Sequence, residues 1–326
     1  MKRALLLLFK ISVTLALFYF LFSRLGFANI MGRVASADMI WLAGGLLVFL
    51  ASMFLSAFQW DLLLKAQGIS LGYGKIFSLY MVGHFFNNFL PGAMGGDVVK
   101  VYRLRRDIRR GKEGLAATFF DRFAGLFMLS LFALAASFYL YFFSHTHMAK
   151  ELFLWLGLLF VVFLLSIALF FSRRVQAFVY DTLLKNINPL RLRDKVRDIH
   201  DYLHIYRGKR GLYGWVFGTS LVTQFLRIAV HYFAARAVGF EIAFVYFLIF
   251  VPIIALAASL PVSFGGLGVR EGLGQVLFST VSPSGPLAVA TQFLASLIGI
   301  AVSLLGGLIF VAERRNGQEK HVKGSA

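Results

Sequence analysis

Charged side chains interrupt several apolar stretches of this chain, and ionisable residues in such stretches are candidates for function by default. Cations in that setting can bind anionic groups, whereas carboxylates balance the positive charge or carry a coupling proton. The four cations are Lys100, Arg122, Arg227 and Arg270, and the three carboxylates are Asp97, Asp121 and Glu271. Gln224 and His231 lie three residues before and four residues after Arg227, so all three share one face of a predicted helix.

Internal ion pairing is the alternative role for these groups, because a buried charge is stable only when it is paired and hydrogen-bonded. The pairs that this alternative predicts are Lys100 with Asp97, Arg270 with Glu271 or a carbonyl, Arg227 with Asp97 or Glu271, and Asp121 with Arg122. The sequence leaves the ligand-binding and the pairing roles open.

A repeated helix-breaking element carries several of these residues. Residues 90–100 and residues 260–270 both read L-P-x-x-x-G-G-x-x-V-[K/R] without gaps, and Leu260 lies 170 positions after Leu90. Proline ends the preceding helix and glycine permits a tight turn, so each copy predicts a helical hairpin. Paired breaks in two halves of a membrane chain point to a transport site. The predicted hairpin tips are shaped by Pro91, Gly95, Gly96, Pro261 and Gly268.

The helix that follows each break is expected to begin inside the membrane with free N–H groups and a positive dipole end, which favours anions such as phosphate. Asp97 follows Gly96 and would occupy that position in the first copy. The second copy has Leu267 at the equivalent place, so its helix start is the better anion site. The residues predicted to bind the substrate are Asn88, Lys100, Arg122, Arg227, Gly265, Gly266 and Arg270.

The composition predicts a membrane protein. The chain has 326 residues, of which 59% are hydrophobic, and its mean hydropathy is +0.76. Long apolar runs recur along it, and a soluble protein would expose too much apolar surface. The net charge of +18 therefore indicates basic loops beside anionic lipid rather than nucleic-acid binding. Cysteine is absent, which excludes disulfides and thiol chemistry.

The positions of apolar and basic segments predict an all-α polytopic membrane protein with about six full transmembrane helices and two re-entrant helical hairpins in an inverted repeat. Loops 103–112 and 173–211 hold six and ten Lys or Arg, so they and both termini are expected in the cytoplasm. With these segments on the cytoplasmic side, the number of membrane crossings between them makes the two hairpins enter the membrane from opposite faces. The predicted full spans are residues 4–22, 39–60, 115–143, 151–171, 213–235 and 287–311, and the hairpins are residues 76–102 and 242–278.

The chain is expected to form one integral membrane domain with two inverted halves, residues 1–143 and 144–312, and a cytoplasmic tail, residues 313–326. The sequence KAQG at residues 65–68 precedes the first hairpin, and RAVG at residues 236–239 precedes the second. Within the second half, residues 173–211 carry apolar stripes with basic faces. That pattern favours two helices lying on the inner leaflet, with an ordinary solvated linker as the alternative.

No catalytic constellation is evident, and the sequence predicts neither an enzyme nor a bound cofactor. His200 and His204 have the spacing of metal ligands on a helix, but no third ligand accompanies them, so no metal site is expected. Phosphate-binding loops, dinucleotide fingerprints and serine nucleophile motifs are also missing. Without a nucleotide site, any transport would be gradient-driven, coupled or passive.

Three segments resemble one known family. Residues 87–97 read NNFLPGAMGGD, residues 121–126 read DRFAGL, and residues 263–271 read SFGGLGVRE. They are similar to the transmembrane, flippase-like domain of lysylphosphatidylglycerol synthases and its stand-alone bacterial and archaeal relatives, over essentially the whole chain. The resemblance implies a protein of the cytoplasmic membrane that moves lipids between leaflets. Only a short basic tail follows Val311, so the aminoacyl-transfer activity of the full synthases is not expected.

The function expected from residues and resemblance together is a lipid flippase or transporter for an anionic or headgroup-modified phospholipid or glycolipid. Its partners would be membrane lipids, and enzymes of lipid biosynthesis are further candidates. Two alternatives remain: an accessory protein that scaffolds lipid or glycolipid biosynthesis without transporting anything, and a secondary transporter of small solutes or ions. A lipid headgroup requires a cavity open sideways to the bilayer, whereas an ion site is small and closed.

Overall fold

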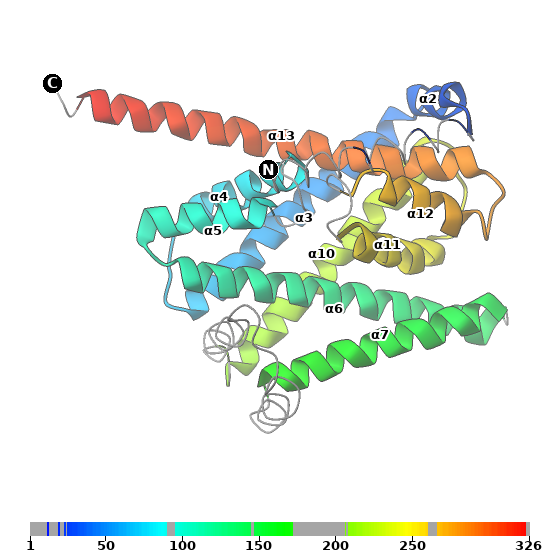
Figure 1. Ribbon diagram of the computed structural model, residues 1–326, viewed down its shortest axis with the longest axis horizontal. Helices are drawn as coiled ribbons and strands as arrows, with labels where there is room; N and C mark the ends of the chain where they lie inside the picture. Colours follow the sequence, from blue (N-terminus) through cyan, green and yellow to red (C-terminus); the bar gives the residue numbers. More distant parts are fainter. Residues whose placement is uncertain are drawn as a thin grey trace.

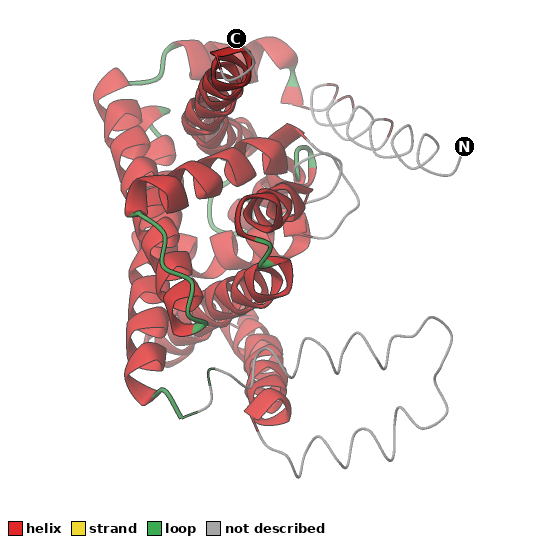
Figure 2. Cartoon of the chain, turned by 90° about the vertical axis from the view of Figure 1, so that its left-hand side faces the viewer, coloured by secondary structure: helices red, strands yellow, loops and turns green. Residues whose placement is uncertain are grey.

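The computed structural model describes residues 25–89, 95–144, 147–171, 208–259 and 266–323, together with Ser12, Tyr19, Ser23 and Tyr206. Every regular element in these ranges is a helix (Figures 1 and 2). Three helices contain a stretch long and apolar enough to cross a membrane, namely α3 (Met39–Ala66), α6 (Gly111–Ser144) and α13 (Gly285–Lys323). The described part of the chain is thus all-helical, as predicted, and these three helices fit a protein that crosses a membrane.

The remaining helices are shorter or more polar. They are α2 (Phe27–Ala35), α4 (Tyr73–Phe89), α5 (Gly95–Ile108), α7 (His147–Phe171), α10 (Arg210–Ala237), α11 (Phe244–Ser259) and α12 (Val269–Phe278). Predicted spans 151–171 and 213–235 fall within α7 and α10, whereas span 4–22 and the basic segment 173–211 lie almost wholly outside the described residues.

Two long helices, α3 and α10, pack along each other through the middle of the molecule (Figure 1). Glycines in α3 allow this approach, since a Cβ on Gly44 would lie 2.6 Å from the ring of Phe233 in α10. Helices α6 and α7 lie side by side, and α13 packs on α4 and α12. The candidate site lies among α3, α4, α6, α10, α12 and α13.

Both predicted helix breaks are present. Helix α4 ends at Phe89 and α5 begins at Gly95, and the two pack against each other. Helix α11 likewise ends at Ser259 before α12 begins at Val269, and these also pack together. The first tip differs from expectation, because Gly95 and Gly96 form the first turn of α5 instead of lying in the connection.

Gly96 has a packing role that the sequence did not indicate. A Cβ added to Gly96 would lie 1.7 Å from the carbonyl oxygen of Gly83 and 2.6 Å from the backbone nitrogen of Asn87, both in α4. The missing side chain therefore lets the two backbones touch, which is how small residues bring membrane helices together. In the second copy the glycines act through backbone conformation, since Gly266 and Gly268 have φ of 80° and 81°.

The helices on either side of the two breaks follow the same order. A 28-residue helix, a shorter helix, the break, a short helix and a long helix occur as α3 to α6 and again as α10 to α13. Helices α3 and α10 also end alike: Gly68 and Gly239 have φ of 76° and 74°, and each follows a residue with φ near −95°. The KAQG and RAVG segments are thus equivalent helix ends.

A cluster of charges joins α4, α5 and α13 at one end of the bundle. Arg103 forms an ion pair with Glu313, and Ser78 donates a hydrogen bond to the same carboxylate at 2.6 Å. Lys75 contacts Asp107 at 2.9 Å. Burial alone would raise the pKa of the Asp107 carboxyl, but the hydrogen bond and charge of Lys75, aided by Arg106, hold it below its ordinary value. Glu313, which the sequence pattern placed at the start of the tail, is part of this contact.

Candidate functional site

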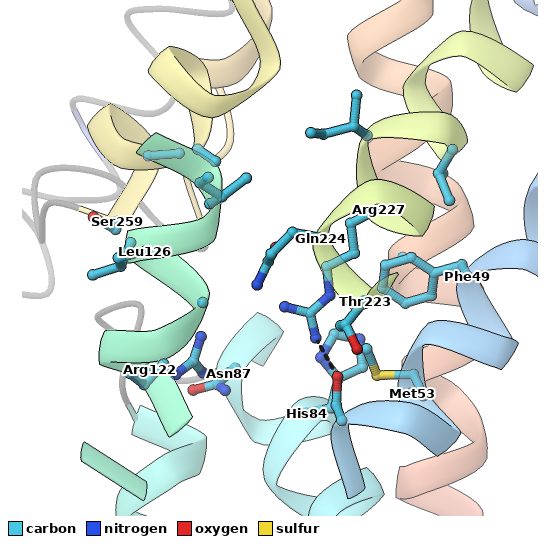
Figure 3. Close-up of a pocket in the computed structure, with 18 of the residues that line it drawn as sticks. Phe49, Met53, His84, Asn87, Arg122, Leu126, Thr223, Gln224, Arg227 and Ser259 are labelled. Atoms are coloured by element: carbon cyan, nitrogen blue, oxygen red, sulfur yellow. Dashed lines mark hydrogen bonds between the residues drawn. The ribbon is translucent and has the colours of Figure 1, made fainter. Parts of the chain in front are cut away.

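A cavity of about 310 Å³ lies between the helices and is lined by six of the seven charged residues singled out above, all except Glu271. Figure 3 shows Thr223, Gln224 and Arg227 projecting from α10 into the space that Arg122 and Asn87 approach from α6 and α4. Its polar lining consists of Ser56 and Gln59 from α3, Tyr80, His84, Asn87 and Asn88 from α4, Asp97 and Lys100 from α5, Asp121 and Arg122 from α6, Ser220, Thr223, Gln224, Arg227 and His231 from α10, Ser259 from α11, Arg270 from α12, and Ser296 from α13. The fold therefore brings residues from both halves of the chain to one place.

Asp97 neutralises two of the cations. Its Oδ2 accepts a hydrogen bond from Arg122 Nε at 2.8 Å, and its Oδ1 lies 3.7 Å from Lys100 Nζ. Lys100 is 2% exposed, and its ammonium also lies 4.5 Å and 4.4 Å from the ring centroids of Trp60 and Tyr80. The expected Lys100–Asp97 pair is confirmed. Lys100 is accordingly held by protein groups on several sides.

Asp121 is buried without a salt bridge in the described part of the chain. Gln59 Nε2 donates to its Oδ1 at 2.8 Å, and the Tyr80 hydroxyl lies 3.4 Å from its Oδ2. The alternative in which Asp121 pairs with Arg122 is wrong, because neighbouring helical residues point in different directions and Arg122 faces Asp97 instead. Asp121 is therefore a carboxylate held by neutral donors.

Arg227 and Arg270 both face the cavity, and neither forms a salt bridge with any described carboxylate. Arg227 Nη2 donates to Ser56 Oγ at 3.0 Å, whereas its buried Nε has no partner. Arg122 lines the same cavity, so three guanidinium groups border it. The predicted ion pairs of Arg227 with Asp97 or Glu271, and of Arg270 with Glu271, do not form.

Glu271 is fully buried and acts as a cap for its own helix. Its Oε2 accepts the backbone N–H of Gly268 at 2.7 Å, and its Oε1 accepts the Ser296 hydroxyl at 3.2 Å. In the first copy, Asn87 Oδ1 accepts the N–H of Gly96 at 2.8 Å. One amide at each helix start is thus already bonded to a side chain. The cationic side chains, rather than these amides, are the groups available to an anion.

Some predicted site residues are not placed. Pro91, Pro261 and Gly265 lie outside the described residues, as do His200 and His204. Asn88 lines the cavity at the end of α4, whereas Gly266 lies at the other break, where a Cβ would approach Arg270 Nε within 3.1 Å. Among the described residues, no group of three potential metal ligands comes together.

Sequence reasoning singled out Asn88, Gln224 and His231 but missed the rest of the uncharged lining. Single Ser, Thr, Gln and Tyr residues in apolar helices form no motif. A usable signal was present in α10, where Ser220, Thr223, Gln224 and Arg227 recur at the spacing of one helix face. Gln59 and Tyr80 had no such signal, because only the packing of α3 and α4 against α6 brings them to Asp121.

Comparison with known proteins identifies the family of this chain. The family model described as the lysylphosphatidylglycerol synthase TM region matches residues 7–308. The chain therefore belongs to the family of membrane proteins that carry this region. A similar relative is the UPF0104 membrane protein of Pyrococcus horikoshii, which is 25% identical over 338 residues, covering 97% of this chain and 98% of the relative.

Proposed function

We propose that this protein is a lipid flippase that moves an anionic or headgroup-modified phospholipid or glycolipid between the leaflets of the cytoplasmic membrane. The observation that carries the proposal is the presence of Arg227 and Arg270 in one cavity without a carboxylate partner among the described residues. A charge inside a membrane is costly unless it is compensated, and a ligand phosphate would compensate these two. The headgroup would bind between them while the acyl chains remain in lipid.

Transport would proceed by alternating access around the two interrupted helix pairs. In this proposal α4–α5 and α11–α12 are re-entrant hairpins that dip in from opposite leaflets, and the two halves form an inverted repeat. The matching order of helices in the two halves and the equivalent ends at Gly68 and Gly239 support it. Rocking one half against the other would expose the cavity to each leaflet in turn. Both termini would lie in the cytoplasm.

The test is reconstitution of the purified full chain into vesicles containing a fluorescent anionic phospholipid, with leaflet-resolved quenching as the readout. We expect the protein to accelerate transbilayer movement, and Arg270→Ala to slow it by about tenfold or more, since a charge-assisted hydrogen bond to phosphate is worth about 1.5–3 kcal/mol. Absence of any protein-dependent movement, with Arg270→Ala indistinguishable from the unchanged protein, would favour an accessory role in lipid biosynthesis instead.

Asp121 is the proposed carrier of a coupling proton. Asp97 is held as an anion by two cations and Glu271 caps a helix, whereas Asp121 has only neutral donors and would accept a proton without breaking an ion pair. We expect Asp121→Asn to keep the contacts with Gln59 and Tyr80 and to remain folded.

Asp121→Asn is expected to remove any response of lipid movement to an imposed pH gradient while leaving basal movement measurable. The assay is the same quenching experiment in vesicles with and without a pH step. An Asp121→Asn variant that still responds to the gradient like the unchanged protein would show that the coupling proton, if used, binds elsewhere.

A further inference from the structure

Each interrupted helix pair packs on the last long helix of the other half of the chain. Helix α4 packs on α13, and α11 packs on α6, while α3 and α10 pack on each other (Figure 1). The repeated order of helices makes α4 the counterpart of α11 and α6 the counterpart of α13. The α4–α13 interface and the α6–α11 interface are therefore equivalent contacts, and both join the two halves.

The α6–α11 interface is the one along which the cavity extends. Its apolar lining there consists of Leu126 and Leu129 from α6 and Val251, Ile254, Ala255 and Ala258 from α11. Apolar groups that border a cavity are in contact on one side only, so these two helices are incompletely packed against each other.

The α4–α13 interface is closed by direct contact with the backbone. A Cβ added to Gly306 of α13 would lie 2.1 Å from the carbonyl oxygen of Met81 in α4. Met81 is fully buried and packs in one cluster with Met53 and Val302. Among the described residues, α13 lines the cavity N-terminal to this contact, at Ala295, Ser296 and Gly299. The two equivalent interfaces are thus in different states.

One carboxylate fastens the closed interface. Glu313 of α13 forms an ion pair with Arg103 of α5 and accepts the hydroxyl of Ser78 in α4 at 2.6 Å. The Lys75 ammonium, also in α4, lies 3.9 Å from the same carboxylate. Among ion pairs between two described residues, those of Glu313 are the ones that join the two halves. Its side chain is 31% exposed, so water can replace these partners when the helices separate.

The α6–α11 interface has no equivalent of this contact on α11, because α11 contains no charged residue. That interface can open and close by apolar packing alone, whereas the α4–α13 interface opens only when the partners of Glu313 are released. The charge cluster therefore favours the arrangement in which the α4–α13 interface is the closed one.

We infer that Glu313 is a latch that holds the α4–α13 interface closed, and that this interface opens when the α6–α11 interface closes. The inference rests on the proposed alternating access and specifies which helices separate. Both interfaces join the same two halves, so rocking the halves about the α3–α10 contact widens one interface and narrows the other. Packed interfaces of this kind switch between two discrete arrangements instead of deforming gradually.

The test uses single cysteines as reporters, because the chain has no cysteine of its own. Met81→Cys reports on the α4–α13 interface, where Met81 is fully buried, and Ala255→Cys reports on the α6–α11 interface, where Ala255 lines the cavity. The rate at which a small methanethiosulfonate reagent modifies each cysteine is measured on the purified full chain in detergent. We expect Met81→Cys to react slowly and Ala255→Cys to react rapidly.

Glu313→Gln removes the ion pairs of the latch and keeps an acceptor for the Ser78 hydroxyl. We expect it to raise the modification rate of Met81→Cys about fivefold and to lower that of Ala255→Cys about twofold, as a shift from about 10% to about 50% of the second state requires. Opposite changes at the two reporters are the signature of an exchange between the two interfaces.

Two further variants accompany this change. Arg103→Gln removes the other partner of the ion pair and should shift both rates in the same directions as Glu313→Gln. Glu113→Gln is the matched control, since Glu113 pairs with Arg110 at 3.0 Å within the first half, and it should leave both rates unchanged.

A rise of both rates together would show a general loosening of the fold and would overturn the inference. Unchanged rates in both Glu313→Gln and Arg103→Gln would overturn it as well. The reporters need no lipid, so the lipid-quenching assay judges the proposed function separately. Lipid movement without opposite shifts at the reporters would reject the latch and keep the flippase. Opposite shifts in a protein that moves no lipid would keep the latch and reject the flippase.

Discussion

Arg227→Gln is expected to weaken binding of an anionic short-chain lipid about 10- to 100-fold and to reduce protein-dependent lipid movement by a similar factor. The charge-assisted hydrogen bond to phosphate that the change removes is worth about 1.5–3 kcal/mol. The protein itself should not lose stability, because Arg227 has no carboxylate partner in the described structure and its Nε is buried without an acceptor. The measurements are Kd and thermal unfolding of the purified protein in detergent.

Arg122→Gln is the matched control, since it removes the same charge from another wall of the same cavity. Arg122 is bonded to Asp97 at 2.8 Å, so its loss removes the nearest cation from that carboxylate. We expect a lower unfolding temperature, corresponding to a loss of about 1 kcal/mol in the free energy of unfolding. The loss is small because the Arg122 side chain is 41% exposed. If instead Arg227→Gln destabilised the protein more than Arg122→Gln, Arg227 would be a structural residue and the anion site would be misplaced.

The second large effect is expected from Gly96→Ala, which should destabilise the folded protein by about 3 kcal/mol. The new Cβ would meet the carbonyl oxygen of Gly83 and the backbone nitrogen of Asn87, and neither atom can move without shifting α4. The better helix propensity of alanine, about 1 kcal/mol, does not offset this clash. The measurement is thermal unfolding together with the yield of monodisperse protein after extraction in detergent.

Gly218→Ala provides the comparison for this change. Gly218 lies within α10 and a Cβ there would meet nothing within 4 Å, so only helix propensity acts and stability should stay equal or rise slightly. Because α5 positions Asp97 and Lys100, a folded Gly96→Ala protein would also be expected to lose the Asp97–Arg122 contact. A variant with unchanged unfolding temperature and unchanged lipid binding would show that α4 and α5 do not need this close approach.

Sequence reasoning located the helix interruptions and the charged residues of the cavity, because both are properties of local chain chemistry. A proline followed closely by paired glycines favours a helix break, although Pro252 lies inside α11 and the pair Gly44–Gly45 inside α3. A charge in an apolar run stands out whatever the fold. Sequence reasoning could not tell which of the cations is neutralised by a carboxylate. Glu271 is adjacent to Arg270 and Asp97 is three residues from Lys100, yet of these two carboxylates only Asp97 pairs with its cation, since Glu271 turns back to the N–H of Gly268.

The sequence by itself determined that this is a helical membrane protein with two interrupted helix pairs, since hydropathy, proline and glycine act along the chain. Tertiary structure alone decided that α3, α6, α10 and α12 meet at one cavity, and that Arg227 and Arg270 face it without a carboxylate partner in the described ranges. The physical reason is that helical periodicity fixes which residues share a face, whereas the register between packed helices fixes which partners that face meets.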